Sequence, residues 1–201
     1  MCLKYLFVPL LKLFVYETTG FERIPKHGPV ILVVNHASYI DPVLAVFFTE
    51  WYRNRKVRGI QSREWVTKTW LRSFIFLKLL GQIPTDGSIT KARDHLHAGG
   101  VLLLFPEGNR TNDGKMQKAT HTGLGVLASQ AKATVVPIGI EGSYAWWPPS
   151  KRLPSLKPRC MAVRVGKPMK FTGKPTKENF LAFQRQAMQA IAKLAKTKYP
   201  Y

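Results

Sequence analysis

The stretch VILVVNHASYIDP, residues 30–42, is the strongest fold signal in the chain. Its first five residues form an uninterrupted apolar run, which is typical of a strand that is covered on both faces. The run stops at Asn35 and His36, and Asp41 and Pro42 follow before the next apolar pattern begins. Proline is favoured in the first turn of a helix. The stretch therefore predicts a buried strand, a polar loop and a helix, in that order, as in an α/β domain.

The same alternation of short apolar runs and helical patterns continues to the C-terminus. Further strands are expected at Val57–Gln61, Val101–Phe105, Val135–Ile140 and Met161–Val165, and helices at Pro42–Thr49, Trp65–Leu80, Ser88–Ala98, Lys118–Ala131 and Phe180–Leu194. Pro137 lacks a backbone N–H, so its strand is expected at a sheet edge or to end there. The chain has 201 residues, of which 45% are hydrophobic, enough for one core. We therefore expect a single α/β domain with a mixed β-sheet flanked by helices.

The first sixteen residues, MCLKYLFVPLLKLFVY, are apolar but too short to cross a membrane, which takes about 20 apolar residues. They include Lys4, Pro9 and Lys12 and lack the small-residue cleavage site of a secretory signal. We expect an amphipathic helix in the membrane interface, with both lysines reaching lipid headgroups. The alternative is a helix packed on the core of the domain itself. On the first hypothesis, residues 1–18 form the membrane-interface helix and residues 19–201 form the domain.

The charge balance is strongly basic, with 31 Lys and Arg against 11 Asp and Glu, a formal net charge of +20. Such a charge points to an anionic partner, which could be nucleic acid, a membrane surface or a substrate. No helix-turn-helix, zinc-binding or RNA-binding aromatic signature is present. The basic residues are interspersed with tryptophans, a mixture typical of a membrane interface: Trp51, Trp65, Trp70, Trp146 and Trp147. We expect a peripheral or monotopic protein on the cytoplasmic face of the membrane and no nucleic-acid partner, with nucleic-acid binding as the rival hypothesis.

His36 and Asp41 form the candidate catalytic pair, because a loop after a buried strand often carries reactive groups. Histidine titrates near neutral pH and can accept a proton. A carboxylate beside its other ring nitrogen would orient the ring and stabilise the imidazolium, as in serine hydrolases. No G-x-S-x-G nucleophile motif is present, so the base would have to activate a hydroxyl of the substrate itself. The structural alternatives are a hydrogen-bonded histidine and an Asp41 that caps the following helix.

A second polar loop follows the apolar run VLLLF and has the sequence Pro106-Glu107-Gly108-Asn109-Arg110-Thr111. The planar guanidinium of Arg110 suits a phosphate or a carboxylate. Gly108 would let a ligand approach the backbone closely. An ordinary surface turn is the alternative when this loop is considered alone. Beside the first loop, it favours a site that binds an anionic substrate.

Together, the two loops resemble motifs of the glycerolipid acyltransferases, the family of 1-acylglycerol-3-phosphate (lysophosphatidic acid) acyltransferases. NHASYID is similar to the family's N-H-x4-D motif, and FPEGNRT resembles F-P-E-G-T-R-S, with Asn109 for threonine and Thr111 for serine. VVPIGI is similar to the V-P-V/I motif, and GQIPTD, residues 81–86, partly matches G-x-x-F-I-D-R. The motifs occur in the family's order between about Gly20 and Lys170. The resemblance implies the fold of the glycerol-3-phosphate acyltransferases.

The resemblance also implies a mechanism. His36 would deprotonate the acceptor hydroxyl, Asp41 would orient His36, and the hydroxyl would attack the thioester of acyl-CoA or an acyl carrier protein. Arg110 would bind the acceptor phosphate. The other residues expected to bind or shape the substrate site are Asn35, Ser38, Glu107, Gly108, Asn109, Thr111, Pro137 and Ile138. The product would be phosphatidic acid, made for phospholipid biosynthesis. No metal or redox cofactor is required for this chemistry, and Cys2 and Cys160 match no metal-binding spacing.

One departure from the family pattern concerns the acceptor. The second motif of the family usually ends in an arginine that is thought to contact the phosphate, and Gly87 occupies that position here. Lys91, Arg93 or Arg63 could supply the missing charge. Another lysolipid, such as an amino-acid lipid or lysophosphatidylglycerol, is therefore the alternative acceptor. A non-catalytic lipid-binding protein is disfavoured, because the side chains that the mechanism requires are all present: His36, Asp41, Glu107 and Arg110.

Overall fold

The computed structural model describes residues 3–62, 67–70, 82–85, 89–119 and 121–201. Its centre is a seven-stranded sheet with the order β1-β7-β6-β2-β5-β3-β4. The strands are β1 (Val15–Thr19), β2 (Val30–Val34), β3 (Val57–Ser62), β4 (Ile83–Thr85), β5 (Val101–Leu104), β6 (Thr134–Glu141) and β7 (Met161–Val165). All neighbouring strands are parallel except β6 and β7. The mixed α/β sheet that the sequence predicts is thus confirmed.

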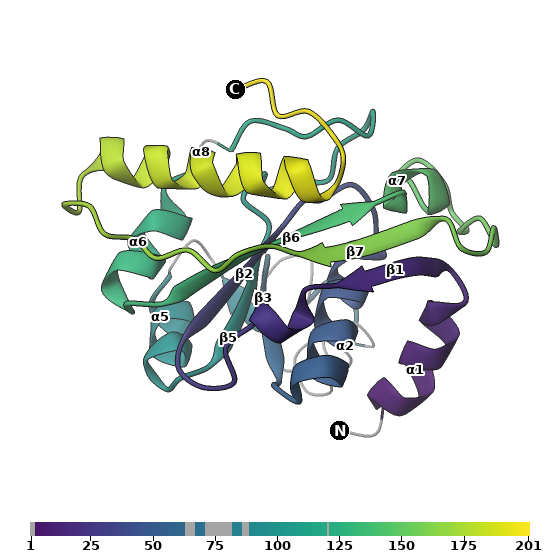
Figure 1. Cartoon of the computed structure of the whole chain (residues 1–201), viewed down its shortest axis with the longest axis horizontal. Helices are drawn as coiled ribbons and strands as arrows, with labels where there is room; N and C mark the ends of the chain where they lie inside the picture. Colours follow the sequence, from purple (N-terminus) through teal and green to yellow (C-terminus); the bar gives the residue numbers. More distant parts are fainter. Residues whose placement is uncertain (1–2, 63–66, 71–81, 86–88, 120) are drawn as a thin grey trace.

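Helices cover both faces of the sheet and give three layers (Figure 1). The elements are α1 (Leu3–Lys12), the 3-10 helix η1 (Phe21–Arg23), α2 (Asp41–Arg53), α5 (Thr90–His97), α6 (Gly123–Gln130), α7 (Ser143–Trp146) and α8 (Lys177–Leu194). One hydrophobic cluster joins the sheet to α1, α2 and α7, and a second joins the opposite face to α5, α6 and α8. Successive residues of β2 alternate between the two clusters, which explains its continuous apolar run.

The predicted strands agree with the observed ones, but the expectation for Pro137 is wrong. β6 lies between β2 and β7, and Pro137 pairs with Val33 in the middle of the sheet. The carbonyl of Pro137 accepts a bond from Gly166 N–H, so the missing N–H faces the β7 side. β7 has already ended at Val165, and the chain rejoins β6 only where Met169 bridges to Val135. The proline therefore lies just beyond the paired residues of β6 and β7, and the pairing of β6 with β2 continues through it.

Most of the predicted helices are also found. α2 and α5 lie where expected, and α8 buries three residues of the predicted stripe, Phe183, Ala187 and Ile191. α6 begins at Gly123, later than the expected start at Lys118. The expected helix at Trp65–Leu80 and the capping residue Ser88 lie largely or wholly outside the described residues.

The N-terminal helix packs on the core of the domain, as in the second alternative, and also exposes apolar side chains. Val8 and Leu11 of α1 are buried in the hydrophobic cluster that includes α2, while several of its large apolar side chains face outward: Tyr5, Leu6, Phe7 and Leu10. Lys4 does not extend to headgroups as expected, because its Nζ donates to Glu50 O and Asn54 Oδ1 at the end of α2. The helix ends at Lys12, so the expected boundary at residue 18 falls inside β1. Within the described part of the chain, no helix is long and apolar enough to traverse a bilayer.

Candidate active site

The two polar loops meet at one edge of the sheet because their strands are parallel neighbours. β2 and β5 run side by side with Val33 opposite Leu104, so the residues that follow both strands emerge together. The carboxyl end of a parallel sheet is the usual place for a ligand site in α/β proteins. Thr111 N–H donates to His36 O at 3.0 Å, which joins the second loop to the first.

His36 is held in the position required of a base. Its Nδ1 lies 3.5 Å from Asp41 Oδ2, and its ring is 12% exposed. The ring stacks on Phe105, with centroids 4.0 Å apart and planes at 21°. Packing on one face and a carboxylate beside one nitrogen leave the other nitrogen, Nε2, as the atom that can meet a substrate. Orientation of this kind is what a general base needs.

Asp41 is a fully buried carboxylate at the start of α2. Its Oδ2 accepts hydrogen bonds from Ala37 N–H and Ser38 N–H, each at 2.6 Å. The alternative of a helix N-cap is wrong, since the carboxylate bonds backward to the loop and not forward to the first turn. The same oxygen lies 3.5 Å from His36 Nδ1, which has no hydrogen-bond partner among the described residues, so Asp41 shapes the loop and places its carboxylate beside the ring. Its Oδ1 has no hydrogen-bond partner among the described residues.

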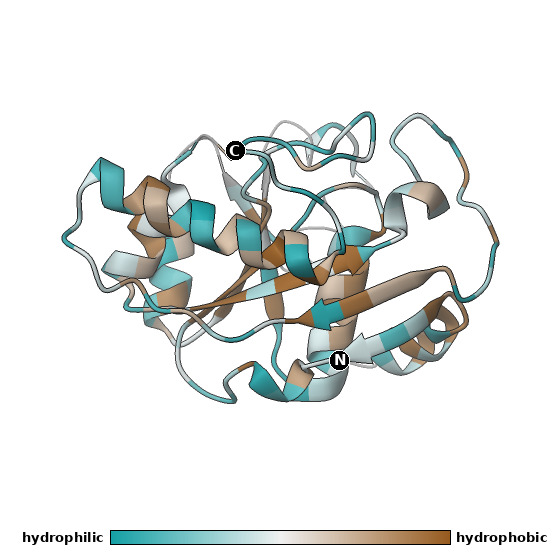
Figure 2. Ribbon diagram, turned by 45° about the horizontal axis from the view of Figure 1, so that its top comes forward, coloured by the Kyte–Doolittle hydropathy of each residue, from teal (hydrophilic) through white to brown (hydrophobic). Residues whose placement is uncertain are grey.

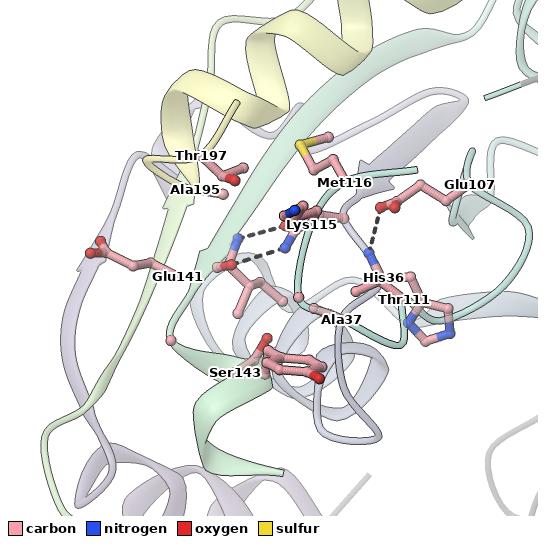
Figure 3. Close-up of a pocket in the computed structure, with 15 residues that line it drawn as sticks. His36, Ala37, Glu107, Thr111, Lys115, Met116, Glu141, Ser143, Ala195 and Thr197 are labelled. Carbon is pink, nitrogen blue, oxygen red and sulfur yellow. Dashed lines mark hydrogen bonds between the residues drawn. The ribbon is translucent and has the colours of Figure 1, made fainter. Parts of the chain in front are cut away.

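Glu107 joins the two loops from the other side, as Figure 3 shows. Its Oε1 accepts from His36 N–H at 2.9 Å and its Oε2 accepts from Gln117 N–H at 2.7 Å. Burial raises the pKa of Glu107 to about 7, although both N–H bonds act in the opposite direction. Because each oxygen accepts a hydrogen bond from a backbone N–H group, Glu107 holds the two loops together. Glu107 also lines the pocket of the site, and direct contact with the acceptor stays a prediction.

Arg110 is the residue of the second loop that remains available to a ligand. Its guanidinium lies over the Tyr39 ring, 4.3 Å from the centroid, and its Nε has no hydrogen-bond partner in the described structure. Gly108 and Asn109 are exposed beside it. Gly108 has a positive φ of 80° with open space where a Cβ would be, so glycine serves the turn here. Stacking on an aromatic ring presents the fork of the arginine in a fixed orientation.

Three further predicted substrate-binding residues form the frame of the site. The amide of Asn35 exchanges two hydrogen bonds with the backbone of Ile140, at 2.9 and 2.8 Å, and thereby extends the pairing of β2 with β6. Ser38 Oγ donates to Trp147 O at 2.6 Å. Thr111 Oγ1 donates to Asp113 Oδ1 at 2.7 Å. These polar groups bond within the protein and position the loops; Asn35 and Thr111 also line the pocket of the site, and direct contact with the substrate stays a prediction.

A pocket opens between the two loops and the end of β6 (Figure 3). Its lining includes residues that the sequence does not single out: Lys115, Met116, Ser143, Tyr144 and Thr197. Pro137 and Ile138 do not line it, because both are buried in the middle of β6; the end of the same strand lines it with Ile140 and Glu141. Lys91 is exposed on α5 and is not part of this lining, and Arg63 lies outside the described residues.

Two aromatic residues of the site were missed at the sequence level. Phe105 stacks on His36, and Tyr39 packs under Arg110 and beside Trp147. Their positions within the FPEGNRT and NHASYID stretches are a signal in the sequence, but an aromatic residue at a strand end is more often part of the core. Proton removal at His36 and anion binding at Arg110 are the roles expected of these side chains; His36 lines the pocket, whereas Arg110 lies outside its lining. This combination requires no nucleophile from the protein.

Comparison with known proteins agrees with this site. Residues 15–141, which include both loops, match the family model described as acyltransferase. The chain belongs to the acyltransferase family. The matched region runs from β1 to the last residue of β6, so it includes His36, Asp41 and Arg110 but ends before α7.

Two curated acyltransferases and one solved structure are similar to this chain. A 1-acyl-sn-glycerol-3-phosphate acyltransferase of Chlamydomonas reinhardtii is 26% identical over 88% of this chain and 52% of the relative. A lyso-ornithine lipid O-acyltransferase of Pseudomonas aeruginosa is 29% identical over 56% of this chain and 43% of the relative. The chain thus spans about half the length of these relatives. The crystal structure of the 1-acyl-sn-glycerophosphate (LPA) acyltransferase PlsC from Thermotoga maritima superimposes with a TM-score of 0.75 at 23% identity, covering 98% of this chain and 78% of that one, and confirms the fold.

Proposed function

We propose that this acyltransferase moves a fatty acyl group from a thioester to the free hydroxyl of 1-acylglycerol-3-phosphate. The observation that carries the proposal is the placement of His36 against Asp41, 3.5 Å apart, at the rim of the sheet that also presents Arg110. The name of the Chlamydomonas relative supports this acceptor. Phosphatidic acid is the product.

In this mechanism His36 Nε2 takes the proton of the acceptor hydroxyl as its oxygen attacks the thioester carbonyl. The negative charge of Asp41 stabilises the imidazolium that forms. Collapse of the tetrahedral intermediate breaks the C–S bond, and the imidazolium returns the proton to the departing thiolate. The new ester and the free thiol account for every atom, and the base is restored without a covalent enzyme intermediate. Acyl-CoA or an acylated carrier protein serves as the donor, and no cofactor takes part.

Arg110 binds the phosphate of the acceptor. A guanidinium that is stacked on Tyr39 and has no ion-pair partner in the described structure can offer two parallel donors to phosphate oxygens. Its loop is joined to the His36 loop through Glu107 and Thr111, so the anion and the base are held in a fixed relation. This positioning is what aligns the hydroxyl with His36.

A lysolipid with an amino-acid headgroup is the second candidate acceptor. The Pseudomonas relative is named for lyso-ornithine lipid, and Gly87 stands where glycerophosphate-using family members carry a second cation. If the acceptor carries a phosphate, Lys91 or Arg93 would supply the positive charge that Gly87 lacks. The K91E/R93E variant would then use phosphate-bearing acceptors less well, and unchanged kinetics would exclude this role.

The protein works as a peripheral or monotopic enzyme on the cytoplasmic face of the membrane, where lysolipids and acyl thioesters meet. The outward apolar side chains of α1 and the net charge of +20 support attachment to anionic lipid.

A single assay tests the function. Purified protein is incubated with labelled acyl-CoA and with a panel of acceptors: 1-acylglycerol-3-phosphate, lyso-ornithine lipid and lysophosphatidylglycerol. We expect the wild type to show its highest kcat/KM with 1-acylglycerol-3-phosphate. We expect the His36→Ala variant to show almost no transfer to any acceptor. A higher kcat/KM with lyso-ornithine lipid would replace the proposed acceptor, and transfer by the variant at the wild-type rate would overturn the mechanism.

A further inference from the structure

The segment of residues 148–160, between α7 and β7, exposes apolar and basic side chains together. Leu153 and Leu156 are 75% and 76% exposed, among the most exposed large apolar side chains of the described structure. Four exposed cations surround them: Lys151, Arg152, Lys157 and Arg159. Figure 2 shows the segment as a long excursion from the body of the protein, with apolar stretches along it. Isolated exposed leucines are common, but two on one loop between four cations are not a typical soluble surface.

This segment lies beside the N-terminal helix. Arg159 N–H donates to Leu13 O and Cys160 N–H donates to Phe14 O, each at 3.0 Å. Figures 1 and 2 both place α1 and the segment at the same end of the molecule. The exposed apolar residues of the N-terminus, Leu10 and Leu13 among them, therefore belong to the same region of the surface as the leucines of the segment.

The charge of this region has one sign. No aspartate or glutamate occurs between Gly142 and Lys177 or among residues 1–16. The four cations of the segment form no ion pair with any of the described residues. Uncompensated cations around exposed apolar side chains complement a surface that is anionic outside and apolar inside, and an anionic bilayer has this composition.

We propose that the 148–160 segment is a second membrane-docking element, which acts together with α1 on an anionic lipid bilayer. Leu153 and Leu156 enter the boundary between headgroups and acyl chains, and the cations bind lipid phosphates. The proposal rests on the proposed function only in assuming that the protein works at a membrane, and it names the surface that makes the contact.

The base of the same segment contacts the candidate active site. Trp147 O accepts the hydrogen bond of Ser38 Oγ. The Trp147 ring lies 5.3 Å from the Tyr39 ring, on which the guanidinium of Arg110 stacks. A shallow groove lined by Tyr39, Trp147 and Lys151 lies at this junction. Docking by the segment thus holds the loop that bears His36 at the lipid surface, where a lysolipid headgroup can reach Arg110.

The test measures binding of the full chain to vesicles of phosphatidylcholine with and without 30 mol% phosphatidylglycerol, a composition of our choosing that gives a surface of known charge. Each basic residue near an anionic leaflet contributes roughly a fivefold factor in affinity. We expect L153S/L156S and K151Q/R152Q each to weaken binding to anionic vesicles by roughly tenfold or more, the latter effect shrinking in high salt. Hydrogen exchange should show protection of residues 148–160 when vesicles are added.

K174Q/K177Q is the matched charge control, because these exposed lysines precede and begin α8 at the opposite end of the molecule (Figure 1). Equal losses in this control and in K151Q/R152Q would show a diffuse charge effect and overturn the proposal. The proposal would also be overturned if L153S/L156S bound vesicles as the wild type does and residues 148–160 showed no protection. The same holds if the variants of the segment raised KM for an acylated carrier protein while their vesicle binding stayed unchanged. Turnover of a short-chain, monomeric lysolipid should persist in all variants; its absence in the wild type would count against the proposed function and not against docking.

Discussion

The loop after β2 and the loop after β5 look alike in sequence, yet the structure uses their carboxylates in different ways. Both loops follow a buried strand, and both carry one buried acid, Asp41 or Glu107. Asp41 binds two backbone N–H groups with the oxygen that also faces His36. Glu107 accepts a backbone N–H bond from each loop, one at each oxygen, and hydrogen-bonds to no side chain among the described residues. A motif acid can thus serve chemistry or architecture, and only its partners distinguish the two.

The difference extends to the cations and rings of the loops. The first loop presents an imidazole, and the second presents a guanidinium that is stacked on Tyr39 from the first. In the proposed mechanism, proton transfer and anion binding are divided between the two loops, which Glu107 joins. Four substitutions test this division, and they follow from the largest expected effect to the smallest.

His36→Ala should lower kcat by about 1000-fold, because it removes the only proposed base while the loop keeps its backbone bonds. Steady-state kinetics with labelled acyl-CoA measure the effect. His97→Ala, at an exposed position on α5, is the matched control and should retain the wild-type kcat. A loss of less than about tenfold would remove His36 from the mechanism.

Asp41→Asn should lower kcat by about 100-fold, since the amide oxygen can still accept from Ala37 and Ser38 but no longer carries the charge that stabilises an imidazolium. Asp41→Ala should also unfold at a lower temperature, because two buried N–H groups lose their acceptor. If both variants lose activity only in proportion to their stability, Asp41 is an architectural residue like Glu107.

Arg110→Ala should raise KM for a phosphate-bearing acceptor by roughly tenfold to a hundredfold, the range for one lost charge-assisted contact, with a smaller change in kcat. Arg110→Lys should recover part of this loss, since it keeps the charge but not the planar fork. Arg185→Ala, at an exposed position on α8, is the control. An unchanged KM for the acceptor in Arg110→Ala would move anion binding elsewhere.

Glu107→Gln should act on stability and its pH dependence more than on catalysis. Burial raises the pKa of Glu107 to about 7 from an ordinary value of 4.5, so the folded state binds an extra proton between these values. The free energy of unfolding therefore falls as pH rises through this window, by up to about 3 kcal/mol.

Urea unfolding between pH 5 and pH 8 measures this slope. The Glu107→Gln variant should lack the part that Glu107 contributes, whereas Glu22→Gln, at an exposed position, should keep the wild-type slope. An unchanged slope in Glu107→Gln would show that the carboxylate titrates normally and that its two backbone bonds outweigh its burial.

Several features of the site could be predicted from the sequence because they depend on local pattern. The run Val30–Val34 and the run Val101–Leu104 predict buried strands, and parallel strands bring the residues that follow them to one edge. His36, Asp41 and Arg110 could be named on this basis. The hydrogen bonds of Asn35 could not be predicted in this way. Its partner Ile140 is 105 residues away, and the contact exists only once β6 has paired with β2.

The position of Pro137 shows the same limit. The missing N–H of proline favours a strand at the sheet edge. Whether a central strand tolerates Pro137 depends on where the neighbouring strand β7 ends. Lys4 is a further case, because a lysine on an apolar helix could reach lipid or a carbonyl of its own protein. The bond to Glu50 O decides between them, and it requires α1 and α2 to be packed together.

The amino-acid sequence by itself determined five of the seven strands, most of the longer helices, the family motifs and the candidate reactive side chains, because apolar periodicity and short motifs act within a few residues. It did not predict β1, β4 or α7. Only the tertiary structure decided which polar groups face a ligand and which are consumed within the protein. Hydrogen-bond partners far apart in the chain compete for each buried carboxylate and amide, and every such group must be satisfied once water is excluded. That competition engages both oxygens of Glu107 with backbone N–H groups, and in the proposed mechanism it leaves His36 and Arg110 to meet the substrate.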